Sequence, residues 1–285
     1  MTRTPLLGSH MSVSGGMYRA FERAGATGCT TMQVFTKNNS RWEARPYTPG
    51  EIEQYYAAAS ASPVAPVLAH ASYLINLCAA DAGILAKSRA ALRDELERCE
   101  LLGISGLIVH PGAHMGAGPA EGTKRIAESL NLIHAQTPGY RTRTVLETTA
   151  GQGTAMGSRF EELAGILSLL RDVERGAVCL DTCHVFAAGY DIGAGRGWEE
   201  TMAAFEGTIG MGRLAAVHVN DSRRERGSRI DRHEHIGKGK IGLEGFRMLM
   251  NDPRLEGIPK ILETEKSDDM HEDIENMNVL RSLIT

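Results

Sequence analysis

Cysteine is scarce in this sequence, and its spacing suggests no pairing. The five cysteines are odd in number and contain no Cys-x-x-Cys pair. Neither a disulfide framework nor an all-cysteine zinc site is therefore indicated, and reduced thiols are expected. Cys183 stands beside His184, but adjacent residues at a strand end point apart, so we interpret Cys183 as a structural cysteine.

Long apolar runs and linker-like tracts are also missing. The first ten residues hold only Leu6 and Leu7 as strong hydrophobes, too few for a signal-peptide core, and no later stretch approaches membrane-spanning length. With 285 residues, 42% of them hydrophobic, the chain can bury one full core. We expect one domain over residues 1–285 in a soluble, cytoplasmic protein with no membrane partner.

An excess of positive charge is absent, since the formal net charge is −4. Nucleic-acid binders usually show a basic surface, so this balance argues weakly against such a partner. Positive charge is nevertheless concentrated in one segment, which is either a solvated loop or a phosphate-binding surface. Between Ser222 and Lys240 the chain carries Arg223, Arg224, Arg226, Arg229, Arg232, Lys238 and Lys240 against Glu225, Asp231 and Glu234.

No Gly-x-Gly-x-x-Gly turn follows an early strand, which disfavours a doubly wound dinucleotide-binding sheet. Eight short β-type runs instead alternate with segments of helical periodicity, such as Ala86 to Leu102. A capping box at Thr48 predicts the start of another helix, and the last helix is expected from about Asp268 to Leu283. Eight β/α units at this length predict a single-domain (β/α)8 TIM barrel of the α/β class. The runs are Leu6 to His10, Thr31 to Thr36, Val64 to His70, Gly106 to His110, Thr144 to Thr148, Ala177 to Asp181, Ala215 to Asn220 and Lys260 to Thr264.

The ends of these strands carry the chemistry. TIM barrels place their active sites at the carboxyl ends of the strands, and seven of the eight ends here finish at or beside a residue able to bind a metal ion. A single His in such a place is more often structural, but the set predicts a convergent metal site. The ends lie at or beside His10, Thr36, His70, His110, Glu147, Asp181, His218 and Glu263.

Loop residues on the same face extend the set of candidate ligands. His184 follows the sixth strand, and Asp231 and His233 lie two apart in the basic segment, where an extended chain gives them a common side; His235 has the same spacing and stays open. Nine ligands are too many for one ion and suit two or three. His and carboxylate groups without thiolate suit zinc or manganese. The nine are His70, His110, Glu147, Asp181, His184, His218, Asp231, His233 and Glu263.

Several ions held close together are a common solution for phosphodiester hydrolysis, and they require no separate nucleophilic side chain. The sequence blocks around the nine residues resemble the endonuclease IV family of abasic-site endonucleases, and the resemblance covers nearly the whole chain. The matching blocks are residues 70–77 (HASYLINL), 146–153 (LETTAGQG), 180–184 (LDTCH), 186–191 (FAAGYD), 218–221 (HVND), 227–234 (GSRIDRHE) and 261–264 (ILET).

This resemblance implies a TIM barrel that cuts double-stranded DNA on the 5′ side of abasic sites, leaving 3′-hydroxyl and 5′-deoxyribose phosphate ends. It implies three zinc ions per chain, with some manganese possible, and a monomeric enzyme. A metal-bridging hydroxide would attack phosphorus, with Glu147 and Glu263 as the catalytic carboxylates. By the resemblance, Glu147 bridges two ions, His70 and His110 hold the first, Asp181, His218 and Glu263 the second, and His184, Asp231 and His233 the third.

The resemblance also implies that the abasic sugar is flipped out of the duplex while side chains fill the gap. Tyr73 and Leu74 match two such inserting residues. Ser40 stands where a familiar bacterial member has an intercalating arginine, and Arg41 is the candidate to replace it. The other candidate DNA contacts are Lys37, Arg229 and Arg232.

Histidines and tryptophans away from the strand ends are given structural interpretations. We expect His134 and His271 to be solvated on helices, and Trp42 and Trp198 to be packing or loop residues. His114, four residues after His110, is either a support for that ligand or a surface residue.

The main alternative function is a metal-dependent sugar isomerase or epimerase of the xylose isomerase type. Glu147, Asp181, His218 and Glu263 would satisfy the metal site of such an enzyme by themselves. The other five candidate ligands and the basic segment have no role there, and they favour the nuclease. A third possibility is a DNA-damage binder in which ions only organise loops.

Overall fold

The computed structural model describes residues 4–285, so the first three residues of the predicted domain lie outside it. Its central feature is a closed barrel of eight strands, in which every neighbouring pair is parallel. The predicted single-domain TIM barrel is confirmed. Around the barrel the order is β1 (Leu7–Met11), β10 (Lys260–Leu262), β7 (Leu214–His218), β6 (Gly176–Asp181), β5 (Arg143–Glu147), β4 (Gly106–Val109), β3 (Val67–His70) and β2 (Thr31–Phe35).

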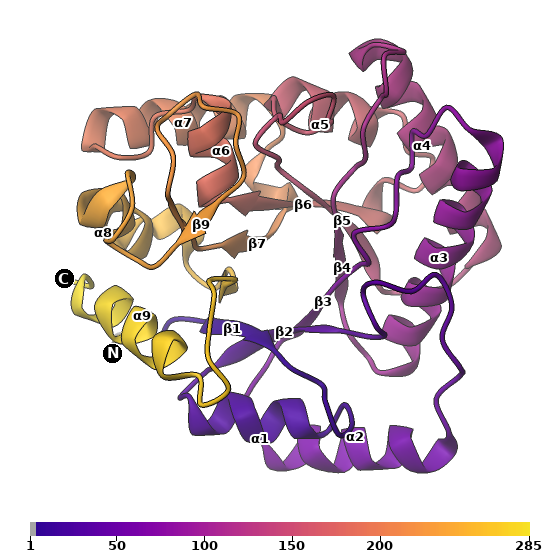
Figure 1. The fold of residues 1–285 in the computed structure, drawn as a ribbon, viewed down its shortest axis with the longest axis horizontal. Helices are drawn as coiled ribbons and strands as arrows, with labels where there is room; N and C mark the ends of the chain where they lie inside the picture. The colour runs from indigo at the N-terminus through magenta and orange to yellow at the C-terminus, as the bar shows by residue number, and fades with distance from the viewer. Residues whose placement is uncertain (1–3) are drawn as a thin grey trace.

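Helices surround this barrel, and the last of them lies beside the first strand (Figure 1). A hydrogen bond of 2.8 Å from the Ser9 hydroxyl to Asp273 joins the two ends of the fold. Among residues 4–285 no helix has the length and apolar character needed to cross a membrane. The helices are α1 (Arg19–Ala26), α2 (Pro49–Ala61), α3 (Ala82–Leu101), α4 (Pro119–Gln136), α5 (Phe160–Ser168), α6 (Thr182–Ala188), α7 (Gly195–Thr208), α8 (Gly242–Asn251) and α9 (His271–Ser282), with short 3-10 turns η1 (Val173–Arg175), η2 (Met211–Arg213) and η3 (Pro253–Leu255).

Local capping determines where the predicted helices begin. The capping box of α2 is present, with the Thr48 side chain and the Glu51 carboxylate each accepting a hydrogen bond from the other's backbone amide. Helix α3 begins at Ala82, four residues before the predicted start, because the Asp81 carboxylate caps it by accepting from the amide of Ile84.

The basic segment contains a short antiparallel hairpin that the sequence pattern did not predict. It pairs β8 (Asp221–Ser222) with β9 (His233–Glu234). The buried Asp221 carboxylate organises the chain that follows β9, because it accepts backbone hydrogen bonds at 3.0 Å from Gly237, Gly239 and Ile241. Strands of two residues carry too little alternation to be recognised from sequence.

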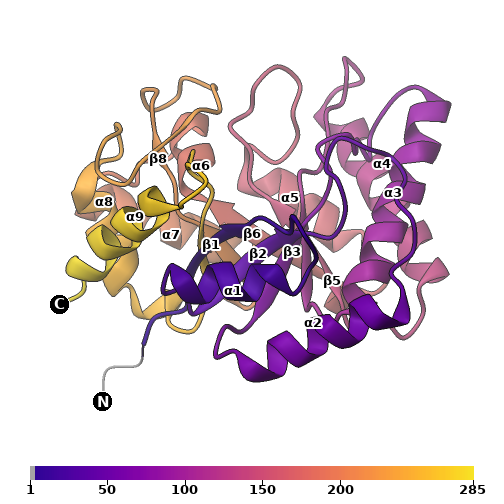
Figure 2. The same ribbon diagram turned by 60° about the horizontal axis from the view of Figure 1, so that its bottom comes forward.

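The inner surface of the barrel is filled by a small apolar layer. Strand side chains alternate between the two faces, so the residue two positions after the last layer residue of each strand also points inward, at the carboxyl end of the barrel. Six of the nine candidate ligands occupy such positions, and Figure 2 shows the long loops rising together on one side of the strands. The layer consists of Leu68, Ile108, Val145, Ala177, Cys179, Ala216 and Ile261.

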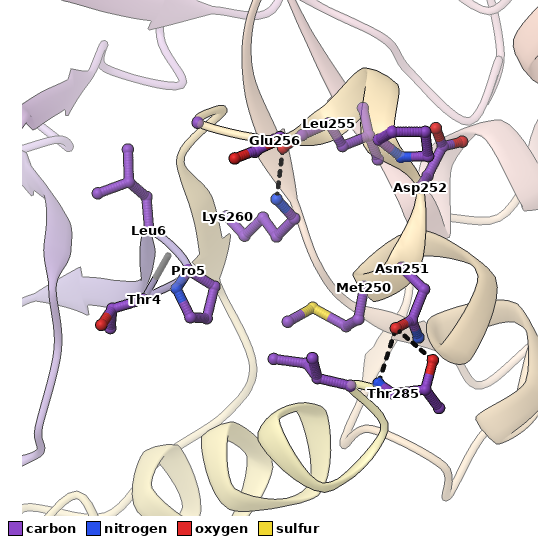
Figure 3. A pocket seen from close by; sticks show the side chains of 13 residues that line it. Thr4, Pro5, Leu6, Met250, Asn251, Asp252, Leu255, Glu256, Lys260 and Thr285 are labelled. Carbon is purple, nitrogen blue, oxygen red and sulfur yellow. Dashed lines mark hydrogen bonds between the residues drawn. The ribbon is translucent and has the colours of Figure 1, made fainter. Parts of the chain in front are cut away.

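A separate cavity lies at the amino end of the barrel, between the chain leading into β1 and the segment joining α8 to β10 (Figure 3). Lys260 is buried there and donates hydrogen bonds to the carbonyls of Leu255 (2.8 Å) and Ile258 (3.2 Å). Burial lowers the pKa of this amine to about 8. The cavity is remote from the strand carboxyl ends and forms no part of the candidate centre.

One interpretation of the isolated histidines is wrong. His134 is buried, and its Nε2 lies 3.0 Å from the Thr144 hydroxyl, because α4 packs this side chain against β5. The expectations for His271 and for the two tryptophans are confirmed. His271 is exposed, and Trp42 is a half-buried loop residue packed against the core. Trp198 is buried, and its indole N–H donates to Asp252 at 2.7 Å.

Candidate metal centre

The first of three ligand groups joins strands β3, β4 and β5. His70, His110 and Glu147 offer ligand atoms within 4.8 Å of one another. The Nε2 atoms of both histidines lie 3.1 Å from Glu147 Oε2. His70 Nδ1 lies 2.7 Å from the Ala71 carbonyl, which can only accept, so Nδ1 carries the proton and Nε2 faces the group.

The second group shares Glu147 with the first and draws on β5, β6, β7 and β10. His218 Nδ1 lies 3.0 Å from both Glu147 Oε1 and Glu263 Oε2, and Asp181 completes the set. Glu147, Asp181 and His218 are fully buried. Three carboxylates packed around one imidazole need positive charge between them to offset their repulsion.

The third group combines the start of α6 with the basic segment. His184 Nε2 lies 3.0 Å and His233 Nε2 lies 3.4 Å from the carboxylate of Asp231. Both nitrogens are buried, and neither has a hydrogen-bond partner within residues 4–285. His184 Nδ1 donates to the Thr148 carbonyl at 2.8 Å, which again leaves Nε2 for the group. Orphaned imidazole nitrogens beside a carboxylate fit a shared cation.

The electrostatics of the second group favour the same conclusion. Burial opposes ionisation of Glu147, but the charge of His218 and the charge and hydrogen bond of His110 hold its pKa well below the usual range. Burial likewise opposes protonation of His218, yet its neighbours, including Glu263 and Glu147, raise its pKa well above the usual value. The site therefore favours positive charge at its centre, whether a proton or a metal ion supplies it.

Cys183 lies within ligand distance of Asp181 and His233. Burial raises the pKa of its thiol to about 12, and its Sγ donates to the Arg232 carbonyl at 3.6 Å. A thiol with this pKa keeps its proton at neutral pH, and a protonated thiol is a poor metal ligand because metal ions bind the thiolate. The contacts agree with the interpretation of Cys183 as a structural cysteine.

Two supporting residues escaped the sequence interpretation. Asn220 donates to Asp181 Oδ2 at 2.7 Å and accepts from the backbone amide of Glu263 at 2.8 Å. Gln33 contacts both His218 and Glu263 from strand β2. Two features of the sequence could have indicated them: Asn220 stands at the end of a predicted strand, and Gln33 is a single amide within an otherwise apolar strand.

The remaining candidate histidines lie around the groups without entering them. His10 Nδ1 is 3.9 Å from Glu263. His235 Nδ1 accepts a hydrogen bond from Asn276 of α9, so this side chain is directed away from the third group. His114 Nδ1 accepts from the amides of Gly116 and Gly118, which makes it a support of its own loop.

Comparison with known proteins decides the family of this chain. A sequence model of the xylose isomerase-like TIM barrel matches residues 21–283. The chain is 47% identical, over 98% of both chains, to a protein named probable endonuclease 4 from Chloroflexus aurantiacus. The chain belongs to the endonuclease IV family. The resemblance found in the sequence is confirmed, and with it the expectation that the chain is an enzyme of an endonuclease family.

Further relatives agree with membership of the endonuclease IV family. A probable endonuclease 4 from Geobacter sulfurreducens is 48% identical over 98% of this chain and 94% of its own. The crystal structure of endonuclease IV from Thermus thermophilus superposes with a TM-score of 0.86 at 39% identity, covering 98% of each chain. A D-tagatose 3-epimerase-like protein has a TM-score of 0.71 at 17% identity over 97% and 96% of the chains, a similarity that shows the fold alone.

In this endonuclease IV family member, two of the predicted inserting residues stand out from the surface beside the ligand groups. Tyr73 is 61% exposed and Leu74 is 37% exposed. Both line a cavity that also contains His110, His184 and Asp231. An aromatic and an aliphatic side chain are thus presented to solvent at the edge of the candidate centre.

The basic segment divides into paired and unpaired side chains. Three arginines of this segment are exposed and have no carboxylate within 4.0 Å in the described chain: Arg224, Arg229 and Arg232. The same is true of Arg41, which lies in the loop after β2. Three of these four are predicted DNA contacts. The paired residues are Arg223 (Glu234 and Glu265), Arg226 (Asp191), Lys238 (Glu275) and Lys240 (Glu225).

Lys37 does not fit a direct contact with DNA, and that prediction is wrong. Its side chain is 1% exposed, its ammonium donates to the Trp42 carbonyl at 2.7 Å, and it lies 3.5 Å from the buried carboxylate of Glu95. Glu95 in turn accepts from the amide of Ser72. The ion pair therefore joins the loop after β2 and the loop after β3, which carries Tyr73, to α3. Lys37 is buried by this tertiary contact, which the local sequence does not reveal.

Lys37→Met is expected to lower the free energy of unfolding by about 3 kcal/mol, because it leaves the Glu95 carboxylate buried without its cation. Urea denaturation measures the change. The same exchange at exposed Lys87 serves as the control. A Lys37→Met/Glu95→Met double variant should recover part of the loss, and an equal or larger loss in the double variant would contradict the ion-pair explanation.

Proposed function

We propose that this chain is a DNA repair endonuclease that hydrolyses the phosphodiester on the 5′ side of abasic sites in double-stranded DNA. Cleavage there leaves a 3′-hydroxyl and a 5′-deoxyribose phosphate. The observation that carries the proposal is the set of three contiguous ligand groups, two of which share Glu147. Relatives at 47% and 48% identity that are named probable endonuclease 4 support it.

Three zinc ions are part of the proposal, with manganese as a possible replacement for some. His70, His110 and Glu147 would hold the first ion, and Glu147, Asp181, His218 and Glu263 the second. The third would be held by His184, Asp231 and His233. The fit rests on donor chemistry, since imidazole and carboxylate groups suit these metals, and on the orphaned Nε2 atoms of the third group.

The catalytic arrangement follows from the charges that the chain maintains. Bound zinc would activate water and offset the negative charge of the phosphate and leaving oxygen. Glu147 and Glu263 remain ionised despite burial, because surrounding histidines lower the pKa of both carboxyls. Asn220 fixes the orientation of Asp181 through its amide. The proposed catalytic carboxylates are Glu147 and Glu263.

Recognition of the abasic site would come from the rim of the centre. Tyr73 and Leu74 would enter the gap left by the flipped sugar. Arg41, Arg229 and Arg232 would contact phosphates, because each presents an exposed guanidinium that has no carboxylate within 4.0 Å among residues 4–285. The Arg232 guanidinium donates only to a backbone carbonyl, that of Asp231 (2.6 Å), within that part of the chain. In this proposal Arg41 takes the place of an intercalating arginine at Ser40.

A monomeric, cytoplasmic enzyme completes the proposal. All five cysteines are free and buried, which suits a reducing compartment. Sedimentation or light scattering at working concentrations tests the monomeric state.

Zinc-restored protein is expected to nick a duplex that contains one tetrahydrofuran abasic analogue, at the 5′ side of the analogue. An undamaged duplex of the same sequence is the control, and we expect cleavage at least about a hundredfold slower there, because extruding a paired base costs a few kcal/mol more. Denaturing electrophoresis of end-labelled strands locates the cut. Binding without cleavage would favour the non-catalytic DNA-damage binder.

A sugar isomerase or epimerase of the xylose isomerase type is the second candidate. Glu147, Asp181, His218 and Glu263 form one complete ligand group, and sugar epimerases share the fold. Such an enzyme needs neither the first nor the third group. Elemental analysis that finds a single ion per chain, together with failure to nick the abasic duplex, would favour this candidate.

A further inference from the structure

Gln33 is a buried polar residue in the middle of β2, and its side chain makes three contacts inside the mouth of the barrel. Its amide nitrogen lies 2.6 Å from Glu263 Oε1 and 3.0 Å from His10 Nδ1. Its amide oxygen lies 2.8 Å from His218 Nε2. One side chain therefore links two proposed ligands of the second ion to a third polar residue.

The orientation of this amide follows from which groups can donate. The Glu263 carboxylate can only accept, so the amide nitrogen of Gln33 must face it and the amide oxygen must face His218. An oxygen there can only accept, so His218 Nε2 carries a proton. The other nitrogen of the ring, Nδ1, is then the one that faces Glu147 and Glu263, each 3.0 Å away.

The second amide hydrogen of Gln33 determines the state of His10. It points to His10 Nδ1, which must therefore accept and hold no proton. The proton of the neutral ring is on Nε2, which is buried and has no hydrogen-bond partner within residues 4–285. The His10 ring packs on Phe35, with centroids 4.2 Å apart, and is thus fixed in place.

Stability alone does not call for an amide at this position. A buried primary amide costs free energy unless its hydrogen bonds are made, and an apolar residue would avoid that cost. Six other strands of the barrel place apolar side chains in the inner layer. The three hydrogen bonds of Gln33 go to groups of the proposed centre and its rim, which indicates a role in that centre.

We infer that Gln33 is a positioning residue of the second ligand group. It holds His218 with Nδ1 toward the ion and holds Glu263 by one oxygen, so that the other oxygen faces the ion. Such contacts with ligands usually change metal affinity about 10- to 100-fold when they are removed. The inference rests on the proposed function as far as the identity of the ion is concerned.

Gln33→Met tests the role, because methionine has a similar length and no amide. We expect zinc to be lost from one site at a chelator concentration about 10- to 100-fold lower than in the wild type, while the other ions stay bound. Cleavage should recover when zinc is added in excess, which a general loss of structure would not allow. Gln54→Met, the same exchange on the exposed face of α2, is the matched control.

The outcomes separate this inference from the proposed function. A wild type that binds no stoichiometric metal overturns the proposed function. A wild type that binds three ions and a Gln33→Met protein that retains all of them with unchanged affinity overturn only the role of Gln33. Nitrogen-15 spectra of histidine in the zinc-loaded wild type give a test that needs no variant: we expect a proton on His218 Nε2 and none on Nδ1, and the reverse would overturn the inference.

Discussion

Glu263→Gln is expected to lower the single-turnover rate of abasic-site cleavage by at least about a thousandfold, equivalent to about 4 kcal/mol of transition-state stabilisation. The substitution keeps the size of the side chain and removes its charge. Glu263 Oε2 lies 3.0 Å from His218 Nδ1 within the second ligand group, and Oε1 accepts from Gln33. A glutamine must therefore direct its amide hydrogens either at Gln33, which also donates, or at the proposed ion.

Binding of the abasic duplex should change little in Glu263→Gln, because the exposed residues proposed to engage DNA lie on other loops. Fluorescence anisotropy with the tetrahydrofuran duplex measures that binding separately from cleavage. Glu265→Gln, two residues further on, is the matched control, since Glu265 is exposed and, among residues 4–285, pairs only with Arg223. Retention of the full cleavage rate in Glu263→Gln would remove this residue from the mechanism.

Stripping the protein with a chelator is expected to abolish cleavage and to lower its melting temperature, and zinc should restore both. The loss of stability has a clear source, because Glu147, Asp181 and Glu263 are packed together and depend on positive charge between them. An ion present at a thousand times its dissociation constant contributes about 4 kcal/mol to folding by mass action. Differential scanning calorimetry and elemental analysis on the same samples measure both effects.

Magnesium added to the stripped protein is the informative control. Magnesium requires octahedral oxygen coordination, and the three groups contain five histidines among nine ligands, so it should restore neither activity nor stability. Full activity in the stripped protein, with no metal detected, would contradict a metal-dependent mechanism.

The sequence by itself determined the barrel and the end of the strands at which the candidate ligands lie. The alternation of side chains along a strand is a local property of the sequence. A residue two positions beyond an inward-facing one therefore also faces inward, as Glu147 does after Val145. Closure of eight parallel strands then brings those positions together. The resemblance to endonuclease IV, rather than strand alternation, pointed to Tyr73 and Leu74, and the structure shows both side chains exposed beside the ligand groups.

Only the tertiary structure decided the partners of individual polar side chains. Lys37 carries the positive charge expected of a DNA contact, yet its side chain is buried, where it pairs with Glu95 of α3 and donates to the Trp42 carbonyl. Gln33 lies in an apolar run, and its role depends on residues from β7 and the end of β10 that are distant in sequence. Hydrogen bonds and ion pairs act over a few ångströms between chain segments, so local pattern contains no record of them.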